Sequence, residues 1–500
     1  MKVIFDTNIL IHIEDPKELS KNLQDLMKIF REHGHQIFIH PISLKDLDND
    51  NNESRKKIIL SKLDGYPRIR SPPKPTNDFL SMVGGSSNSN ELNDNEILFS
   101  ILRNAADFLI TEDYGLQKKA IRANLDDRVL SIDSAFDYFK NLHARNALHH
   151  TLLKEYFLRD LDIEDPFFDS LKDDYGDSDF RDWFKRKSIE DRKCWVYREN
   201  VKIKAMLMLK EENETIPTFP LITASKRLKI ATLKVDMPGS KIGELFLKMA
   251  FQYCISNNIF ETFLTHYRKP EDRLIPLIES FGFEFMGLLE ERKGRMEKEE
   301  VYLKKFIPKE KDVSSFDIAK KFYPSFIDSS SIRKFLIPII PEYHDRLFPD
   351  FMKRQMRITD YSEINIPGNA IKKAYLSHSS ITKIRPGDIL LFYRSHDRKA
   401  ITSIGIVDRE PVHTNDPDKV VAIVGQRSVY LYDEIKDMTQ KPVLVLLFRH
   451  HLNLPRPPDL NYLRNHNIIQ YAPQSIMELN HNQYVAIKKG GKLDERFTVG

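Results

Sequence analysis

Four acidic residues recur near predicted strand ends and helix starts in the first third of the chain. They are Asp6, Asp46, Asp94 and Asp113. In a parallel sheet the carboxyl ends of the strands meet at one edge, so these side chains are expected to converge. Clustered carboxylates raise one another's pKa unless a cation neutralises them. The pattern therefore predicts a site for Mg²⁺ or Mn²⁺ that assists the hydrolysis of a phosphodiester.

A purely structural explanation of the same acids stays open. An Asp-Thr-Asn sequence directly after a strand is also a good helix N-cap, and the other acids could be caps or solvated loop charges. Asp48 and Asp50 compete with Asp46 for the second position, and Glu96 either assists the site or caps a helix.

Residues 1–143 alternate apolar strands with amphipathic helices, which predicts a compact α/β unit around a parallel sheet. The Asp6-Thr7-Asn8 start, the Asp46-Leu47 pair, the Asp94-x-x-Ile97 helix and the Thr111-x-Asp113 ending together resemble the PIN-domain ribonucleases. The resemblance implies a PIN-like α/β/α fold, a metal-dependent endoribonuclease and the four aspartates as metal ligands. It gives Asn8, Thr111 and Glu96 supporting roles. Many relatives carry Glu at the position of Asp46.

Residues 150–308 predict a mixed α/β unit in which a strand at 228–235 leads through a small-residue turn into a helix at 242–257. A helix N-terminus after such a turn can bind a pyrophosphate. With the later helix that ends at Phe281-Gly282-Phe283, the segment resembles the GNAT acetyltransferases. The resemblance implies acyl-CoA (acetyl-CoA) bound by Gly239, Ser240, Lys241, Ile242, Gly243 and Glu244.

Two departures from the GNAT pattern put catalysis in doubt. The family's turn usually has Gly where this chain has Lys241, and Ile278 stands where a Tyr often acts as general acid. Acetyl transfer and a scaffold role both stay open.

Residues 370–500 are expected to form a small β-barrel, after a mainly helical connector at 309–369. The predicted strands are Ile389–Tyr393, Ile401–Val407, Val420–Val424 and Val443–Phe448. The Arg385-Pro386-Gly387-Asp388 turn before an apolar strand resembles the PUA-like superfamily, which includes ASCH and EVE domains. The resemblance implies RNA binding, and the candidate contacts are Lys383, Arg385, Tyr393, Arg394, Arg398 and Lys399. The alternative is a solvated basic face on a structural barrel.

The composition of the whole chain fits a multidomain α/β protein without a membrane segment. Its 500 residues are too many for a single hydrophobic core, so several domains are expected. Its 41% hydrophobic and 30% charged residues are typical of globular domains. Its two cysteines are far apart and the N-terminus lacks a signal-peptide pattern, so a cytoplasmic location is expected. The net charge of +4 means that RNA binding would have to rely on local patches.

These patterns favour a metal-dependent endoribonuclease, toxin-like or active in stress or defence, that carries GNAT-like and RNA-binding modules. RNA and a neutralising antitoxin-like protein are the expected partners. The first alternative is an acetyl-CoA-dependent N-acyltransferase acting on RNA or protein, and the second is a non-catalytic RNA-binding regulator.

Overall fold

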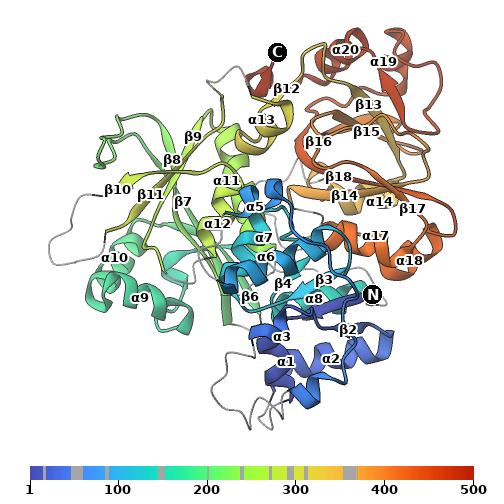
Figure 1. Ribbon diagram of the computed structural model, residues 1–500. Helices are drawn as coiled ribbons and strands as arrows, with labels where there is room; N and C mark the ends of the chain where they lie inside the picture. The colour runs from blue at the N-terminus through green and yellow to red at the C-terminus, as the bar shows by residue number, and fades with distance from the viewer. Residues whose placement is uncertain are drawn as a thin grey trace.

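The computed structural model describes most of the chain as three α/β units that meet at a central junction (Figure 1). The described residues are 1–14, 19–46, 60–84, 89–144, 153–199, 202–236, 241–269, 273–289, 298–308, 313–352, 368 and 370–500. Among these residues, no helix combines the length and the apolar character that crossing a membrane requires.

The N-terminal unit is built on a four-stranded parallel sheet, as predicted. Its strand order is β2 (Gln36–Phe38), β1 (Lys2–Phe5), β3 (Phe108–Ile110) and β4 (Val129–Leu130). One face packs against α2 (Lys21–His33) and α8 (Ile132–Leu142). The other packs against α5 (Asn77–Val83), α6 (Ser89–Leu102) and α7 (Tyr114–Arg122). The short helices α1 (Thr7–Glu14) and α3 (Ser43–Asp46) follow β1 and β2. Strand residues alternate between the two apolar layers, which makes a three-layer unit.

The middle unit contains a seven-stranded mixed sheet. Its order is β10 (Glu284–Leu288), β11 (Glu300–Lys305), β9 (Glu261–His266), β8 (Arg227–Val235), β7 (Lys202–Glu212), β6 (Lys193–Glu199) and β5 (Leu153–Phe157). β8 and β9 run parallel, and the other neighbouring pairs are antiparallel. Helices α11 (Ile242–Ser256) and α12 (Leu274–Glu279) share one apolar core with the sheet. Helices α9 (Asp169–Tyr175) and α10 (Asp177–Ile189) contribute to a separate cluster with β6 and β7.

The C-terminal unit contains a mixed sheet that the described strand pairings leave open. Its order is β14 (Lys372–Ser377), β18 (Val443–Asn453), β16 (Ala400–Val407), β15 (Ile389–Arg394), β13 (Lys334–Ile339) and β19 (Met477–Leu479), with β17 (Val412–Thr414) also paired to β18. Helices α19 (Leu460–Asn465) and α20 (His481–Gly491) pack near its far end. The two end strands, β14 and β19, are not paired with each other in the described part, so the closed barrel expected from sequence is not formed there.

The prediction of a strand at Val420–Val424 is wrong, because these residues belong to helix α17 (Pro417–Val424). Asp416 caps this helix by accepting hydrogen bonds from the backbone N–H groups of Asp418 and Lys419. Pro417 at the first helical position is compatible with a helix start and lacks the N–H that a strand would need. The valines pack into the core on one helix face.

The segment at 309–369 is only partly the helical connector that the sequence predicts. It contains α13 (Ser315–Lys321), α14 (Pro341–Leu347) and α15 (Pro349–Met352). It also supplies β13, which pairs in parallel with β15 inside the C-terminal sheet, and β12 (Phe326–Ile327), which pairs with β20 (Thr498–Val499). Since β13 is almost entirely buried, its apolar residues are core residues of that unit.

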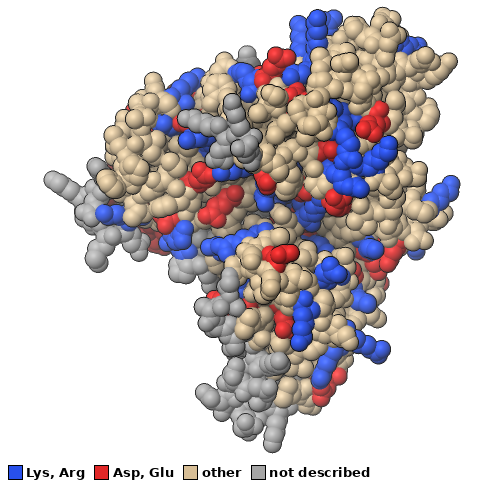
Figure 2. Space-filling view, turned by 45° about the horizontal axis from the view of Figure 1, so that its top comes forward, with Lys and Arg blue, Asp and Glu red and all other residues tan. Residues whose placement is uncertain are grey.

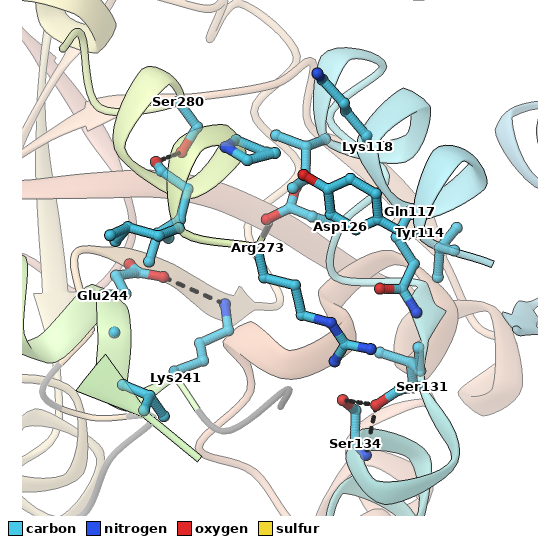
Figure 3. A pocket seen from close by; sticks show the side chains of 18 of the residues that line it. Tyr114, Gln117, Lys118, Asp126, Ser131, Ser134, Lys241, Glu244, Arg273 and Ser280 are labelled. Carbon is cyan, nitrogen blue, oxygen red and sulfur yellow. Dashed lines mark hydrogen bonds and ion pairs between the residues drawn. The ribbon is translucent and has the colours of Figure 1, made fainter. Parts of the chain in front are cut away.

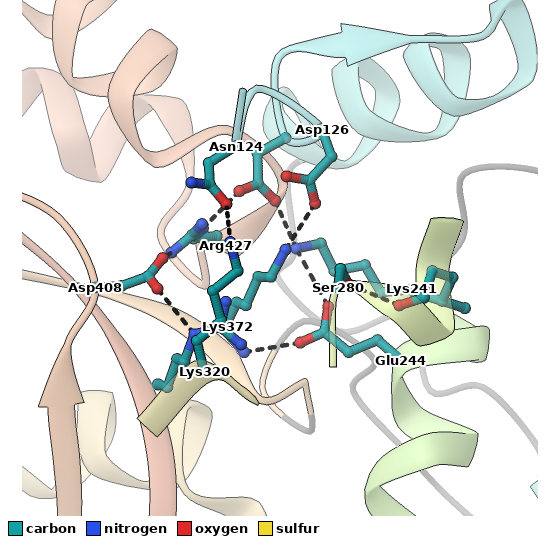
Figure 4. Close-up of polar contacts among 12 residues, drawn as sticks. Asn124, Asp126, Lys241, Glu244, Ser280, Lys320, Lys372, Asp408 and Arg427 are labelled. Atoms are coloured by element: carbon teal, nitrogen blue, oxygen red, sulfur yellow. Dashed lines mark hydrogen bonds and ion pairs between the residues drawn. The ribbon is translucent and has the colours of Figure 1, made fainter. Parts of the chain in front are cut away.

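The three units are joined by a buried network of ion pairs (Figure 4). Asp127, in the loop between α7 and β4, lies 2.5 Å from Nε of Arg427 and 2.7 Å from Nζ of Lys241. Arg427 also contacts Asp408 at 2.6 Å, and Arg449 contacts the other oxygen of Asp408 at 2.8 Å. The N-terminal, middle and C-terminal units therefore each contribute charges to one network.

A second branch of the network runs through Lys372, at the start of β14. Its Nζ lies 2.9 Å from Asp126, and its backbone N–H donates to Glu244 in the first turn of α11 at 2.7 Å. Burial alone would raise the pKa of Asp127, but the charges of Arg427, Lys241 and Lys372 outweigh it and hold the pKa well below the usual range. The carboxylate is therefore ionised, and its position depends on cations from the other two units.

We predict that Arg427→Met lowers the free energy of unfolding by about 3–5 kcal/mol, since it leaves the buried Asp127 and Asp408 carboxylates without their shared cation. Chemical denaturation of the full chain measures the effect. The control is Arg68→Met, which removes an exposed pair with Asp64 and should leave the denaturation midpoint unchanged. Equal midpoints for the two variants would contradict a structural role for the network.

Candidate functional site

Thr111 connects two of the predicted acids at the end of the parallel sheet. The buried Thr111 hydroxyl donates to Oδ2 of Asp6 at 2.7 Å and accepts from the backbone N–H of Asp113 at 2.9 Å. β1 and β3 are neighbours and end at the same edge, which is why residues over 100 positions apart meet here. The structure places Thr111 between Asp6 and Asp113, and its supporting role in a metal site stays a prediction.

Asp94 comes to the same edge, but from within a helix. It lies in the middle of α6 instead of beginning a helix as the sequence suggested. Burial raises the pKa of Asp94, and the charges of Asp113 and Asp6 raise it further, while Lys119 opposes both. Nζ of Lys119 lies 3.1 Å from Oδ2 of Asp94. Three of the four predicted acids therefore interact, and a lysine partly neutralises one of them.

The remaining predicted residues of this edge do not complete a metal site in the described part of the chain. Asp113 caps α7 by accepting from the backbone N–H of Leu116 at 2.7 Å. Asn8 is exposed and Glu96 is half-buried, whereas the side chain of Asp46 lies outside the described residues. Among the described residues, no group of three or more His, Cys, Asp or Glu side chains is arranged to hold a metal ion. The described donors alone therefore do not fit Mg²⁺ or Mn²⁺.

A cavity of about 590 Å³ lies between the N-terminal and middle units (Figure 3). One wall comes from α7, β4 and the start of α8, including Gln117, Lys118 and Ser131. The opposite wall comes from the end of β8, the first turn of α11 and helix α12. Apolar side chains line both walls: Ile121, Val129, Leu130, Leu233, Val235, Leu274, Pro276 and Leu277. Its size is in the range of small-molecule and cofactor sites.

The middle-unit wall exists because β8 and β9 diverge. In the described chain they pair only at Leu228 with Thr262 and at Lys229 with Phe263, although β8 continues to Val235. Leu233 and Val235, beyond the paired part, line the cavity. Gly243 and Glu244, in the first turn of α11, also line the cavity. A Cβ on Gly243 would lie 2.7 Å from Leu277, so glycine lets α11 and α12 approach closely here.

Polar groups stand at the ends of this apolar space. Arg273 extends across the cavity toward Ser131 (Figure 3) and lies 3.6 Å from Glu112 of the N-terminal unit. Lys118, on α7, also lines the cavity. Lys241 also lines the cavity at the beginning of α11. Helix N-termini carry unpaired N–H groups and a partial positive charge that attract anions, although the carboxylates of Asp126, Asp236 and Glu244 also line the cavity.

Only some residues of the predicted pyrophosphate site line the cavity. Lys241, Gly243 and Glu244 line the cavity, Ile242 is buried beneath it, and Gly239 and Ser240 lie outside the described residues. Lys241 points to Asp127, and Glu244 accepts from the backbone of Lys372. Ile278 is fully buried in the core between α11 and α12. No sequence pattern indicated Lys118, Ser131 or Arg273 as cavity residues, because the cavity forms only where two units meet.

Two of the candidate RNA contacts in the C-terminal unit are core residues. Tyr393 is fully buried, and Arg394 is held by Asp345 and Asp397 with 4% of its surface exposed. Assigning these two to an RNA surface was wrong, because both lie on β15 inside a sheet packed on both sides. The other four, Lys383, Arg385, Arg398 and Lys399, are not buried. On the face that Figure 2 shows, Lys and Arg lie in separate patches interspersed with Asp and Glu.

Comparison with known proteins gives only distant structural similarity. No family model and no curated protein matches the chain. The ASCH protein from Zymomonas mobilis is 14% identical, with 31% of this chain and 94% of that chain covered and a TM-score of 0.24. Ard1 from Thermoplasma volcanium is 13% identical, with 32% and 99% covered and a TM-score of 0.25. Arabidopsis thaliana Naa50, in complex with a CoA bisubstrate analogue, is 21% identical, with 23% and 72% covered and a TM-score of 0.19. Similarities this weak carry no functional argument for this chain.

We predict that Asp113→Ala lowers the free energy of unfolding by about 0.5–2 kcal/mol, because it removes the side-chain cap of α7. Asp113→Ser keeps a capping oxygen and should retain most of the stability while removing the carboxylate. Thermal and chemical denaturation of both variants measure the difference. If the serine variant is as unstable as the alanine variant, capping is not the main structural role of Asp113.

Proposed function

We propose that the protein binds an acyl-CoA in the cavity between its N-terminal and middle units and transfers the acyl group to an amine of RNA or protein. The observation that carries this proposal is the divergence of β8 from β9 beside the first turn of α11. The diverging strand leaves backbone groups of β8 without a β9 partner, and an extended ligand chain can pair with such groups.

The two ends of the cavity suit the two parts of such a ligand. The start of α11, with Lys241, favours the phosphates, and Arg273 offers a second cation at the opposite side. The apolar wall between Leu233 and Leu277 suits the less polar pantetheine and acyl portions. These residues bind and orient the ligand and keep water from it.

When bound, the thioester supplies an activated acyl group that an amine can attack. The residue at the position where a general acid would be expected, Ile278, is buried and apolar. The proposal therefore assigns the chain's own residues binding and orientation, which by themselves can accelerate a transfer between two positioned reactants.

Binding of acetyl-CoA to the full chain, measured by calorimetry, is the first test. Arg273→Met should weaken binding about tenfold, since it removes a charge-assisted hydrogen bond to the ligand. Arg268→Met is the matched control, because Arg268 is similarly exposed and contacts Glu300 and Tyr302 outside the cavity. Transfer is then followed as label from acetyl-CoA that enters RNA or protein. Absence of binding to the wild type and to every variant tested would rule out the proposal.

A second candidate function is hydrolysis of RNA at the edge formed by Asp6, Asp94 and Asp113. It is favoured by the Thr111 link between Asp6 and Asp113 and by the charges of these two residues, which add to the burial that raises the pKa of Asp94. The PIN-like resemblance, the RNA contacts of the C-terminal unit and an antitoxin-like partner belong to this candidate and stay predictions. It also needs a further ligand, for which Asp46 is the candidate.

Cleavage of RNA in the presence of Mn²⁺ tests this second candidate. Asp6→Asn and Asp113→Ser should each reduce the cleavage rate by at least about 100-fold if the carboxylates act on the reacting groups. Asp64→Asn serves as the control, because Asp64 is an exposed acid paired with Arg68 away from this edge. Cleavage by the two site variants at the wild-type rate would exclude these acids.

A further inference from the structure

Lys241 is a cavity residue whose charge is already engaged by another unit. It precedes the first residue of α11, but its side chain does not cap that helix. Its Nζ lies 2.7 Å from Oδ1 of Asp127 and 3.8 Å from Glu244, and only a tenth of its side chain is exposed. A phosphate bound at the start of α11 would therefore meet a lysine that an internal carboxylate holds.

Asp127 can lose Lys241 without becoming an unpaired buried charge. Its other oxygen, Oδ2, is bound by Arg427 at 2.5 Å, and Arg409 lies 3.8 Å from the same oxygen. Both arginines come from the C-terminal unit, whereas Lys241 comes from the middle unit. Transfer of the lysine to a ligand would leave the Asp127 carboxylate with two cations. The exchange therefore avoids the full free-energy cost of leaving a buried carboxylate unpaired.

We propose that Asp127 competes with the ligand's phosphate groups for Lys241, so that the N-terminal unit restrains ligand binding in the middle unit. This inference rests on the proposed acyl-CoA site and identifies how that site is controlled. A ligand that takes Lys241 weakens one tie between the two units, and any change that loosens this tie tightens ligand binding. The two effects are equal in free energy because binding linkage is reciprocal.

Lys241 lies where the cavity meets the buried network. The cavity contains Asp126, Lys241 and Glu244 in its lining, so its polar end and the buried network are continuous. Asp126 and Glu244 are both bound to Lys372, which lies on β14. Lys241 lines the cavity and also contacts Asp127, so it connects the cavity with the buried network. A phosphate therefore contacts the junction of the three units at Lys241.

Asp127→Asn tests the competition, with binding of CoA and of pantetheine measured by calorimetry on the full chain. The variant should bind CoA at least about fivefold more tightly than the wild type, because its neutral amide holds Lys241 less strongly. Binding of pantetheine, which has no phosphate, should stay unchanged. The matched control is Asp408→Asn, which removes a carboxylate of the same network that contacts Arg427 and Arg449 but not Lys241.

Equal or weaker CoA binding by Asp127→Asn than by Asp408→Asn overturns the competition. If Asp127→Asn does not fold, Lys241→Met decides the question in a variant that keeps Asp127 bound to Arg427. The ratio of CoA affinity to pantetheine affinity should then fall, whereas an unchanged ratio would show that Lys241 is only a structural tie. Failure of CoA to bind the wild type and every variant would instead remove the acyl-CoA site itself.

Discussion

The arrangement of the three units depends on one buried carboxylate. Asp127 belongs to the N-terminal unit, but its two oxygens are bound by Lys241 of the middle unit and Arg427 of the C-terminal unit. A buried charge is tolerated only when partners replace its hydration, and here the partners come from the other two units, so these ion pairs favour one arrangement of the three units. Apolar packing reinforces this arrangement, since one hydrophobic cluster contains both Phe5 of the N-terminal unit and Val421 of the C-terminal unit.

The same junction defines the cavity and connects it with the acidic edge. Helix α7 begins at the cap residue Asp113, and its next turns form a wall of the cavity. Gln117 takes part in both, because it lines the cavity and donates to the carbonyl of Thr111 at 2.7 Å. A ligand in the cavity would therefore contact a helix whose N-cap is Asp113, one of the predicted nuclease residues, so the two candidate sites share one helix.

The fold was largely predictable where local patterns decide it. The strands before Asp6 and Asp113, strand β8 and helix α11 follow from their apolar periodicity. The same approach failed at 420–424, where a short valine-rich run fits a strand and a helix equally well and the cap at Asp416 decides for the helix. It also failed for Tyr393 and Arg394, because a basic and aromatic sequence does not reveal that a sheet is covered on both faces.

The sequence alone determined that the N-terminal unit contains parallel strands and that Asp6 and Asp113 follow strand ends, because local apolar runs set these positions. Which strands are neighbours, and hence that Asp6 and Asp113 both contact Thr111, was decided by the tertiary structure. Only the tertiary structure decided that Lys241 faces Asp127, that Arg427 completes the pair and that a cavity forms between two units. These contacts join residues 114 and 300 positions apart. Charge pairing at such distances leaves no local pattern, because any of the 77 lysines and arginines could satisfy the same carboxylate until packing selects one.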